Sequence, residues 1–309
     1  MLDPNSACHN SAGQQEDHGR LVICPTPIGN LRDITLRTLD TLANCDYVCA
    51  EDTRVTAKLL NAYNISKPLI RMDENTIKRK ASGVIADIQA GKRVCYCSDA
   101  GMPGVSDPGI ALLALAYEQH VSVCVLPGAS ASITAFVASA SSFSNFYFVG
   151  FPPRKKSAFR ELLNALTNLP AAIIFYESPH RLIATLELLA EVFPQRKLCV
   201  LRELTKVHEE VYRDSTTSAL EHFSARAQQG GIRGELVIVL DGARHEVSQE
   251  EAKRSREDVR TYLEQLAHEG MSMRDARKKA AESTDLPKNE IYDLALEVYG
   301  KKSRQTSKS

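Results

Sequence analysis

The sequence has no apolar stretch that approaches the roughly 20 residues needed to span a bilayer, which excludes a membrane-spanning helix. Its N-terminal segment, residues 1–19, lacks the basic start and the apolar run of a secretory signal peptide. The same segment is polar, a composition that predicts a disordered tail. We therefore expect a cytoplasmic protein without membrane association.

The chain also has no net charge, because 38 lysines and arginines balance 38 aspartates and glutamates. No overall field draws the chain to a polyanion, so any contact with nucleic acid must come from local basic patches. Eight cysteines are present, but the close pairs Cys45/Cys49 and Cys95/Cys97 have no second pair at zinc-ligand spacing. Most cysteines lie in apolar runs, so we expect reduced, buried thiols and no bound metal.

Short apolar runs alternate with amphipathic helical patterns from Leu21 to Leu240. In the first half of this range the alternation is typical of an α/β domain with a parallel sheet, and 309 residues leave room for a second α/β domain. Residues 248–302 carry no strand-like run and predict three helices, with a turn at 283–290 as in a helix-turn-helix. The predicted segments are a tail (1–19), an N-terminal α/β domain (20–128), a second α/β domain (129–242), a helical module (243–302) and a disordered tail (303–309).

Glycine and aspartate are densest in the segment 98–109, SDAGMPGVSDPG, which follows a predicted buried strand and leads into a helix. Ligands of open α/β sheets bind at this carboxyl edge of the strands. The three glycines permit close backbone approach and the two aspartates can accept hydrogen bonds, so a ligand site is favoured over a purely structural turn. The spacing fits neither a G-x-G-x-x-G dinucleotide site nor a P-loop.

Two further turns follow predicted strands and are expected at the same sheet edge. They are residues 25–31, PTPIGNL, and residues 127–132, PGASAS. The three turns should converge on one crevice, and the small residues of the last one suit a backbone pressed against a flat ring.

These turns and four other segments resemble, in order along the chain, the motifs of the small-subunit ribosomal RNA cytidine 2′-O-methyltransferases. The resemblance runs from about Leu21 to Gly242, and residues 272–299 resemble more loosely a small helical module that many members append. The motifs are Thr26–Leu31, Glu51–Arg54, Ser98–Gly101 with Ser106–Gly109, Pro127–Ala131, Phe148–Lys155, Tyr176–Leu182 and Arg202–Lys206.

The resemblance implies an α/β, two-domain tetrapyrrole-methylase-like (class III methyltransferase) fold with a small C-terminal helical module. It also implies S-adenosylmethionine as methyl donor, a homodimer, and 2′-O-methylation of a cytidine ribose in the decoding region of 16S ribosomal RNA, with free RNA or the 30S subunit as partner. For the donor it indicates Pro27, Ile28, Gly29, Asp99, Ala100, Gly101, Pro103, Val105, Ser106, Asp107, Ser130, Ser132 and Ile133. The chain departs from the family at Met102, usually Thr, and at Gly104, usually a bulkier aliphatic, and either change would reshape the donor pocket slightly.

Methyl transfer to a ribose hydroxyl needs aligned reactants and a group that removes the proton or stabilises the alkoxide. Charged residues that follow strand ends are the candidates, and surface or interdomain salt bridges are the alternative explanation for them. The catalytic candidates are Lys155, Lys206, Glu177 and Arg54. The candidates for RNA binding are Arg154, Lys155, Lys156, Arg181, Arg277 and Lys278. In the C-terminal helices, aspartates and glutamates balance the basic residues, so these helices could contact protein instead of RNA.

Two other functions stay open from the residues alone. A tetrapyrrole carbon methylase on the same fold would share the donor loop, but segments 51–54 and 176–181 fit the RNA family instead. An RNA-binding scaffold with a degenerate donor site would show no calorimetric binding of S-adenosylmethionine.

Overall fold

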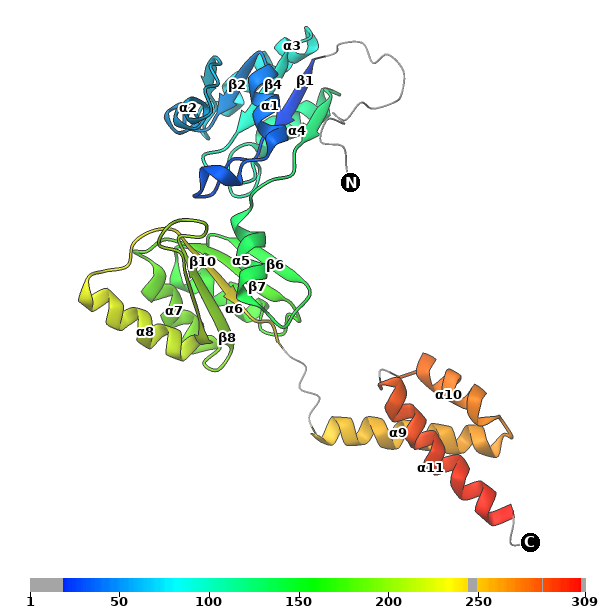
Figure 1. Ribbon diagram of the computed structural model, residues 1–309. Helices are drawn as coiled ribbons and strands as arrows, with labels where there is room; N and C mark the ends of the chain where they lie inside the picture. Colours follow the sequence, from blue (N-terminus) through cyan, green and yellow to red (C-terminus); the bar gives the residue numbers. More distant parts are fainter. Residues whose placement is uncertain (1–18, 244–248, 285, 307–309) are drawn as a thin grey trace. The chain divides into compact units, whose positions relative to one another are not determined.

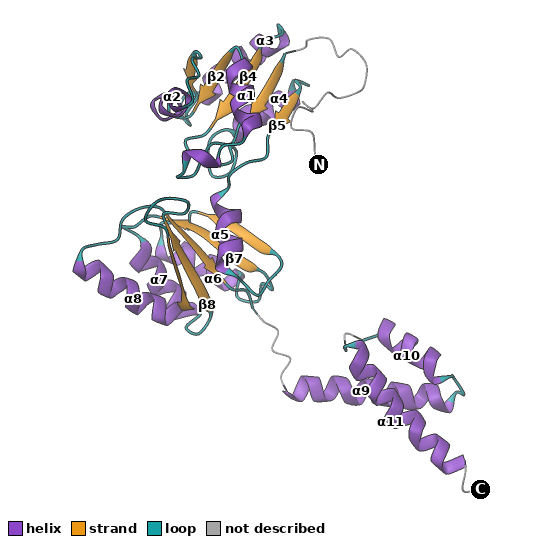
Figure 2. Ribbon diagram, viewed as in Figure 1, coloured by secondary structure: helices purple, strands orange, loops and turns teal. Residues whose placement is uncertain are grey.

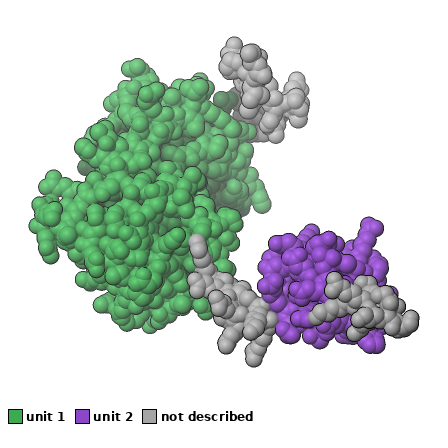
Figure 3. Space-filling view, turned by 60° about the horizontal axis from the view of Figure 1, so that its bottom comes forward, with its two compact units in different colours: residues 1–243 green, residues 244–309 purple. Residues whose placement is uncertain are grey.

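The computed structural model describes residues 19–243, 249–284 and 286–306. They fall into two compact units, one ending at Ala243 and one within residues 244–309 (Figure 3). Most of the predicted N-terminal tail and the link at 244–248 lie outside the described residues.

The first sheet of the larger unit is parallel throughout, as the alternating pattern predicted, with strand order β3-β2-β4-β1-β5. Alternate residues of β1 enter opposite cores, because side chains of a strand point to opposite faces in turn. Helices therefore cover both faces (Figures 1 and 2). The strands are β1 (Arg20–Ile23), β2 (Tyr47–Ala50), β3 (Leu69–Arg71), β4 (Arg93–Cys97) and β5 (Val123–Val125).

Helices α1 (Leu36–Asn44) and α2 (Thr53–Ala62) contribute to the core on one face of this sheet. Helices α3 (Ile77–Gln89) and α4 (Ile110–Glu118) contribute to the core on the other face. Asp52 fixes the start of α2, since its carboxylate accepts the Arg54 N–H at 2.9 Å. The loops after β1, β2 and β4 thus emerge at the carboxyl edge, where sequence reasoning expected the site.

The second sheet is mixed, with order β6-β7-β10-β8-β9, and its only parallel pair among the described strands is β6 with β7. Because β10 runs antiparallel to both of its neighbours, β6, β7 and β8 still end at one edge, where β10 begins. The strands are β6 (Phe146–Gly150), β7 (Ala172–Glu177), β8 (Lys197–Arg202), β9 (Glu210–Ser215) and β10 (Leu236–Leu240).

Helix α5 (Ala131–Ser139) packs on one face of the second sheet. The other face carries α6 (Lys156–Ala165), α7 (Leu182–Val192) and α8 (Thr216–Gln229). The five residues of β10 are buried, as a central strand covered on both faces requires.

The smaller unit consists of α9 (Gln249–His268), α10 (Met273–Glu282) and α11 (Lys288–Thr306) around their own apolar core. Three helices were predicted here. Helix α11 runs to Thr306, into the segment predicted as a disordered tail, whereas residues 307–309 lie outside the described part. In the described part of the chain, no helix combines the length and apolarity needed to cross a bilayer.

Candidate functional site

The turn after β1 (residues 25–31) and the loop after β4 (residues 98–109) are joined by backbone hydrogen bonds. The N–H of Thr26 donates to the Gly101 carbonyl and the N–H of Gly101 donates to the Thr26 carbonyl, each at 3.0 Å. The Thr26 hydroxyl also donates to the carbonyl of Ser98 at 3.3 Å. The loops after β1 and β4 therefore form one connected wall.

The 98–109 loop is shaped by one of its own aspartates. The two carboxylate oxygens of Asp107 accept the N–H groups of Gly104 at 2.7 Å and Gly109 at 2.8 Å. At Gly109 there is no room for a side chain, because a Cβ would lie 2.5 Å from the Tyr96 ring. Ser106 adopts a φ of 64°, a strained backbone for a non-glycine residue. These contacts make the loop a preformed cradle.

The cradle borders a cavity of about 450 Å³, the main cavity, whose wall also includes residues from the second sheet. This volume lies within the range typical of small-molecule sites. The main cavity is lined by Ile28, Glu51, Ser98–Met102, Val105–Asp107, Ser130, Ala131, Phe151, Tyr176–Pro179, Leu204 and Gly234–Val237.

Eight of the predicted donor residues line this cavity: Ile28, Asp99, Ala100, Gly101, Val105, Ser106, Asp107 and Ser130. Pro27 and Gly29 line a neighbouring cavity instead, Pro103 and Ser132 are buried beside the loops, and Ile133 is exposed on α5. Sequence reasoning did not assign Tyr176 or Glu51 to the donor site, although both stand in recognised motifs. Of the two departures from the family, Met102 lines the cavity and Gly104 does not.

Charge in the main cavity is of one sign. Its lining includes the carboxylates of Glu51, Asp99, Asp107, Glu177 and Glu235, and no lysine, arginine or histidine among the described residues. Burial raises the pKa of Glu51, and the nearby Asp99 and Asp107 carboxylates add to this rise against the opposing hydrogen bond from the Asp99 N–H. A cation is the ligand that such a wall favours.

Glu177, predicted as a catalytic candidate, is 3% exposed and its carboxylate is fully engaged. It accepts hydrogen bonds from the Thr185 hydroxyl at 2.5 Å and from the Ser178 N–H at 2.8 Å, and Arg181 lies 3.5 Å away. Arg181 in turn donates to the carbonyl of Pro152 at 2.9 Å. These contacts fix the loops at the edge of the second sheet. They favour a structural role for Glu177 and Arg181, the alternative to catalysis and RNA binding.

Lys206 is held between two carboxylates, with its Nζ 2.9 Å from Glu203 and 3.0 Å from Glu235. Burial works against its charge, but the hydrogen bonds to both carboxylates raise the pKa of Lys206, so it stays protonated. Glu235 also lines the main cavity, which places this ammonium at the cavity rim. The side chain of Lys206 packs on Gly29, where a Cβ would lie 2.5 Å from its Cγ.

The remaining predicted cations lie outside the main cavity. Arg154, Lys155 and Lys156 are exposed at the start of α6. In the smaller unit Lys278 is exposed and the Arg277 guanidinium stacks on the Tyr292 ring at 4.4 Å.

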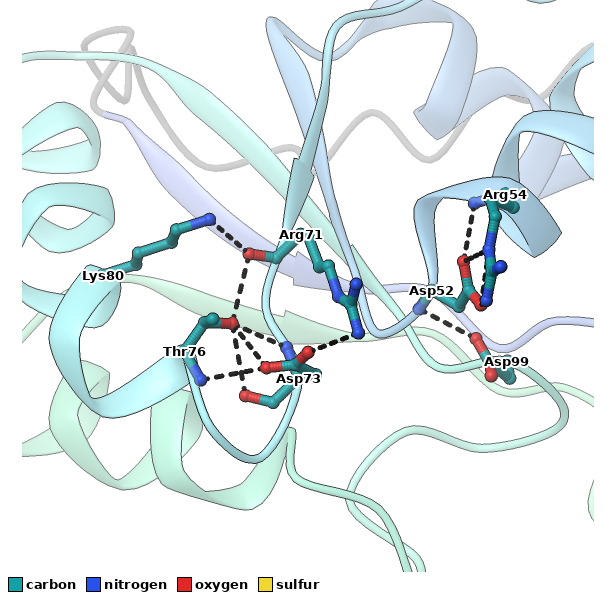
Figure 4. Close-up of polar contacts among 7 residues, drawn as sticks. All are labelled: Asp52, Arg54, Arg71, Asp73, Thr76, Lys80 and Asp99. Atoms are coloured by element: carbon teal, nitrogen blue, oxygen red, sulfur yellow. Dashed lines mark hydrogen bonds and ion pairs between the residues drawn. The ribbon is translucent and has the colours of Figure 1, made fainter.

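Arg54 lies in a group of polar contacts that joins the loops after β2 and β4 (Figure 4). Its guanidinium is 2.5 Å from the Asp52 carboxylate, and the Asp52 N–H donates to the carboxylate of Asp99 at 2.9 Å. Beside them, Arg71 pairs with Asp73 at 2.7 Å. The side chain of Arg54 is 83% exposed, so its cation is presented to solvent.

Comparison with known proteins agrees with this architecture. Residues 20–220 match the family described as Tetrapyrrole (Corrin/Porphyrin) Methylases, and residues 254–298 match the RsmI C-terminal HTH domain. Among solved structures, the uroporphyrin-III C-methyl transferase of Thermus thermophilus, complexed with S-adenyl homocysteine, covers 72% of this chain and 97% of its own at 15% identity and a TM-score of 0.52. The methyltransferase CobJ covers 73% of this chain and 95% of its own, with 19% identity and a TM-score of 0.55. At these identities the likeness shows the fold, and it confirms the predicted one.

Curated relatives are much more similar in sequence. The "Ribosomal RNA small subunit methyltransferase I" of Bacillus subtilis is 38% identical over 280 residues, or 90% of this chain and 94% of that protein. The protein of the same name from Thermotoga maritima is 41% identical over 224 residues, or 72% of this chain and 99% of its own. The chain therefore belongs to the ribosomal RNA small subunit methyltransferase I family, within the tetrapyrrole methylases.

Proposed function

We propose that this protein methylates small-subunit ribosomal RNA with S-adenosylmethionine, at the ribose 2′-oxygen of a cytidine in the decoding region of 16S RNA. The observation that carries the proposal is the main cavity, a preformed cradle whose charged lining is acidic. The relatives named as ribosomal RNA methyltransferases support the substrate class. The neighbour complexed with S-adenyl homocysteine supports the donor class.

The residues of the main cavity fit the donor by their chemistry. Apolar side chains such as Ile28, Val105 and Leu204 can cover an adenine ring, and the backbone at Gly101 allows close approach. The carboxylates favour the α-ammonium and the sulfonium of the donor. When bound, the donor supplies an electrophilic methyl group, so the chain has to align the acceptor oxygen with it.

Lys206 is the best placed of the four catalytic candidates to act on the acceptor. It is protonated and lies beside Glu235 at the cavity rim, where it can stabilise charge that develops on the ribose oxygen. Glu177 holds the loops together with Arg181, and we assign Lys155 and Arg54 to phosphate contact together with Arg154 and Lys156. In the smaller unit we propose Arg277 and Lys278 as RNA contacts of their own.

We further propose a cytoplasmic homodimer that acts on free RNA or the 30S subunit, with division into the segments 20–128, 129–242 and 243–302. The neutral overall charge supports a structured particle as the substrate, because shape then supplements electrostatics.

The test is transfer from labelled S-adenosylmethionine to purified small subunits and to naked RNA, with the product mapped as an alkali-resistant linkage. We expect one resistant cytidine linkage. Label on a base, or transfer to a porphyrin precursor that is offered in place of RNA, would overturn the proposal. Lys206→Met should lower kcat by about 10²-fold while the donor affinity stays within twofold, because removal of one oxyanion-stabilising donor costs about that much. Lys206→Arg keeps the charge and serves as the matched control.

A further inference from the structure

A second cavity of about 330 Å³, the side cavity, adjoins the main cavity and is not explained by donor binding. Its walls are the turn after β1 and the first turns of α2, and Ser98 and Asp99 line both cavities. A molecule in the side cavity would therefore lie next to the donor site across a two-residue border. The side cavity is lined by Thr26, Pro27, Gly29, Leu31, Val55, Thr56, Lys58, Leu59, Ser98 and Asp99.

The walls of the side cavity are held in place from both ends. The Tyr63 hydroxyl, just after α2, donates to the carbonyl of Leu31. The backbone bridge between Thr26 and Gly101 holds the other end of the same turn. The start of α2 is tied to the donor loop by the Asp52 N–H, which donates to Asp99 (Figure 4). The side cavity is thus a formed site between fixed elements.

The chemistry of the side cavity differs from that of the main cavity. Pro27, Leu31, Val55 and Leu59 make it apolar, and its charged lining is one carboxylate and one ammonium, from Asp99 and Lys58. Leu31 and Val55 are 48% and 40% exposed, so the apolar wall reaches solvent.

One hydroxyl in this lining has no partner. Thr56 is 2% exposed and its Oγ1 makes no hydrogen bond within the described part of the chain. Buried hydroxyls are normally paired, so this unpaired one is a candidate for a hydrogen bond to a bound molecule.

We propose that the side cavity takes the base of the target nucleotide, turned out of the RNA structure, so that its ribose lies at the Ser98–Asp99 border facing the donor. This inference rests on the proposed function. A nucleobase is a flat apolar ring with a polar edge, which matches apolar walls that carry one free hydroxyl. Lys58 and Arg54, both exposed on α2, lie where the adjoining phosphates can be neutralised, whereas the acidic main cavity repels them.

The test is a substitution that fills the side cavity at Val55, a residue that does not line the main cavity. Val55→Trp should lower kcat/KM for RNA at least 100-fold and leave the calorimetric affinity for S-adenosylmethionine within twofold. Val137→Trp is the matched control, because Val137 is 73% exposed on α5 and lines neither cavity. It should behave as the wild type. Wild-type kcat/KM in Val55→Trp would overturn the proposal.

If Val55→Trp does not fold, a smaller substitution at Thr56 and a crosslinking experiment test the same proposal. Thr56→Val replaces the hydroxyl with a methyl group and should raise the KM for RNA about tenfold, with rescue by Thr56→Ser. RNA with 4-thiouridine at the nucleotide that the wild type methylates should crosslink to peptides 26–31 or 55–59. Crosslinks confined to other peptides would overturn the proposal. If the wild type transfers no methyl to RNA, the proposed function itself fails, whereas methylation without crosslinks to these peptides overturns only the proposed base site.

Discussion

The two sheets of the larger unit build their carboxyl edges in different ways. At the first sheet the loops are rich in glycine and are held by backbone bonds, such as the bridge between Thr26 and Gly101. At the second sheet the edge consists of charged side chains in pairs, Glu177 with Arg181 and Lys206 with Glu203 and Glu235. The first edge is suited to close contact with a ligand, and the second to fixing loops and presenting charge at the rim.

The largest expected effect comes from closing the cradle of the first sheet. Gly109→Val should abolish donor binding, with a loss of at least 100-fold, because the new side chain collides with the Tyr96 ring. The free energy of unfolding should fall by about 1–3 kcal/mol. Calorimetry with S-adenosylmethionine and denaturant unfolding measure the two effects.

The matched control is Gly83→Ala on α3, where a Cβ meets nothing within 4 Å. It should raise the free energy of unfolding by about 0.5–1 kcal/mol and leave donor binding unchanged. If Gly109→Val binds donor as the wild type does, the cradle is not the donor site.

Glu177→Gln tests whether the second edge is structural. The variant should lose about 1–3 kcal/mol of unfolding free energy, because the buried carboxylate accepts hydrogen bonds from Thr185 and Ser178. Turnover of the folded variant should stay within tenfold of the wild type. Turnover that vanishes while the stability is unchanged would show that Glu177 is catalytic after all.

Glu51→Gln sharpens the electrostatic part of the comparison. Donor affinity should fall by about 5–10-fold at pH 7, as expected for one partly screened charge. In the wild type the affinity should also fall as the pH drops through the raised pKa of Glu51, since the carboxyl then becomes neutral. The variant should lack this part of the pH dependence.

The stability of Glu51→Gln should change in the opposite direction. A carboxyl with a raised pKa in the folded state favours folding only when protonated, so its charged form destabilises the wild type at neutral pH. The variant should therefore unfold at a higher denaturant concentration than the wild type at pH 7, and this gain should shrink as the pH falls. A variant less stable than the wild type at pH 7 would contradict the assignment.

The smallest effect is expected for Arg54→Ala at the exposed rim. Loss of one phosphate contact should raise the KM for RNA about two- to threefold, with a shallower dependence on salt. Donor affinity should not change, because Arg54 does not line the main cavity. Initial rates at two salt concentrations provide the measurement.

The sequence was sufficient to predict the parallel sheet and the turns of the cradle. Gly101 and Gly109 stand in a strand-to-helix turn whose composition is specific enough to indicate close packing. Strand β3 contributes only two adjacent apolar residues, Leu69 and Ile70, a run too short to predict a strand. The position of β10 between β7 and β8 depends on long-range pairing that no local pattern encodes.

The hydrogen-bond partners of polar side chains also could not be predicted. Lys206 and Glu235 are 29 residues apart in the sequence, and their pairing decides that the lysine is a fixed cation at the rim. Asp107 was expected to accept hydrogen bonds from a ligand, but its oxygens bind the backbone of its own loop. In both cases the residue type predicted a polar role, and only the fold determined the partner.

The most direct test of the account is mapping of the methyl group on small-subunit RNA after reaction with labelled S-adenosylmethionine, with the wild type and Gly109→Val side by side. We expect a single alkali-resistant cytidine linkage for the wild type and none for the variant. Label on a base, or equal transfer by the variant, would contradict it.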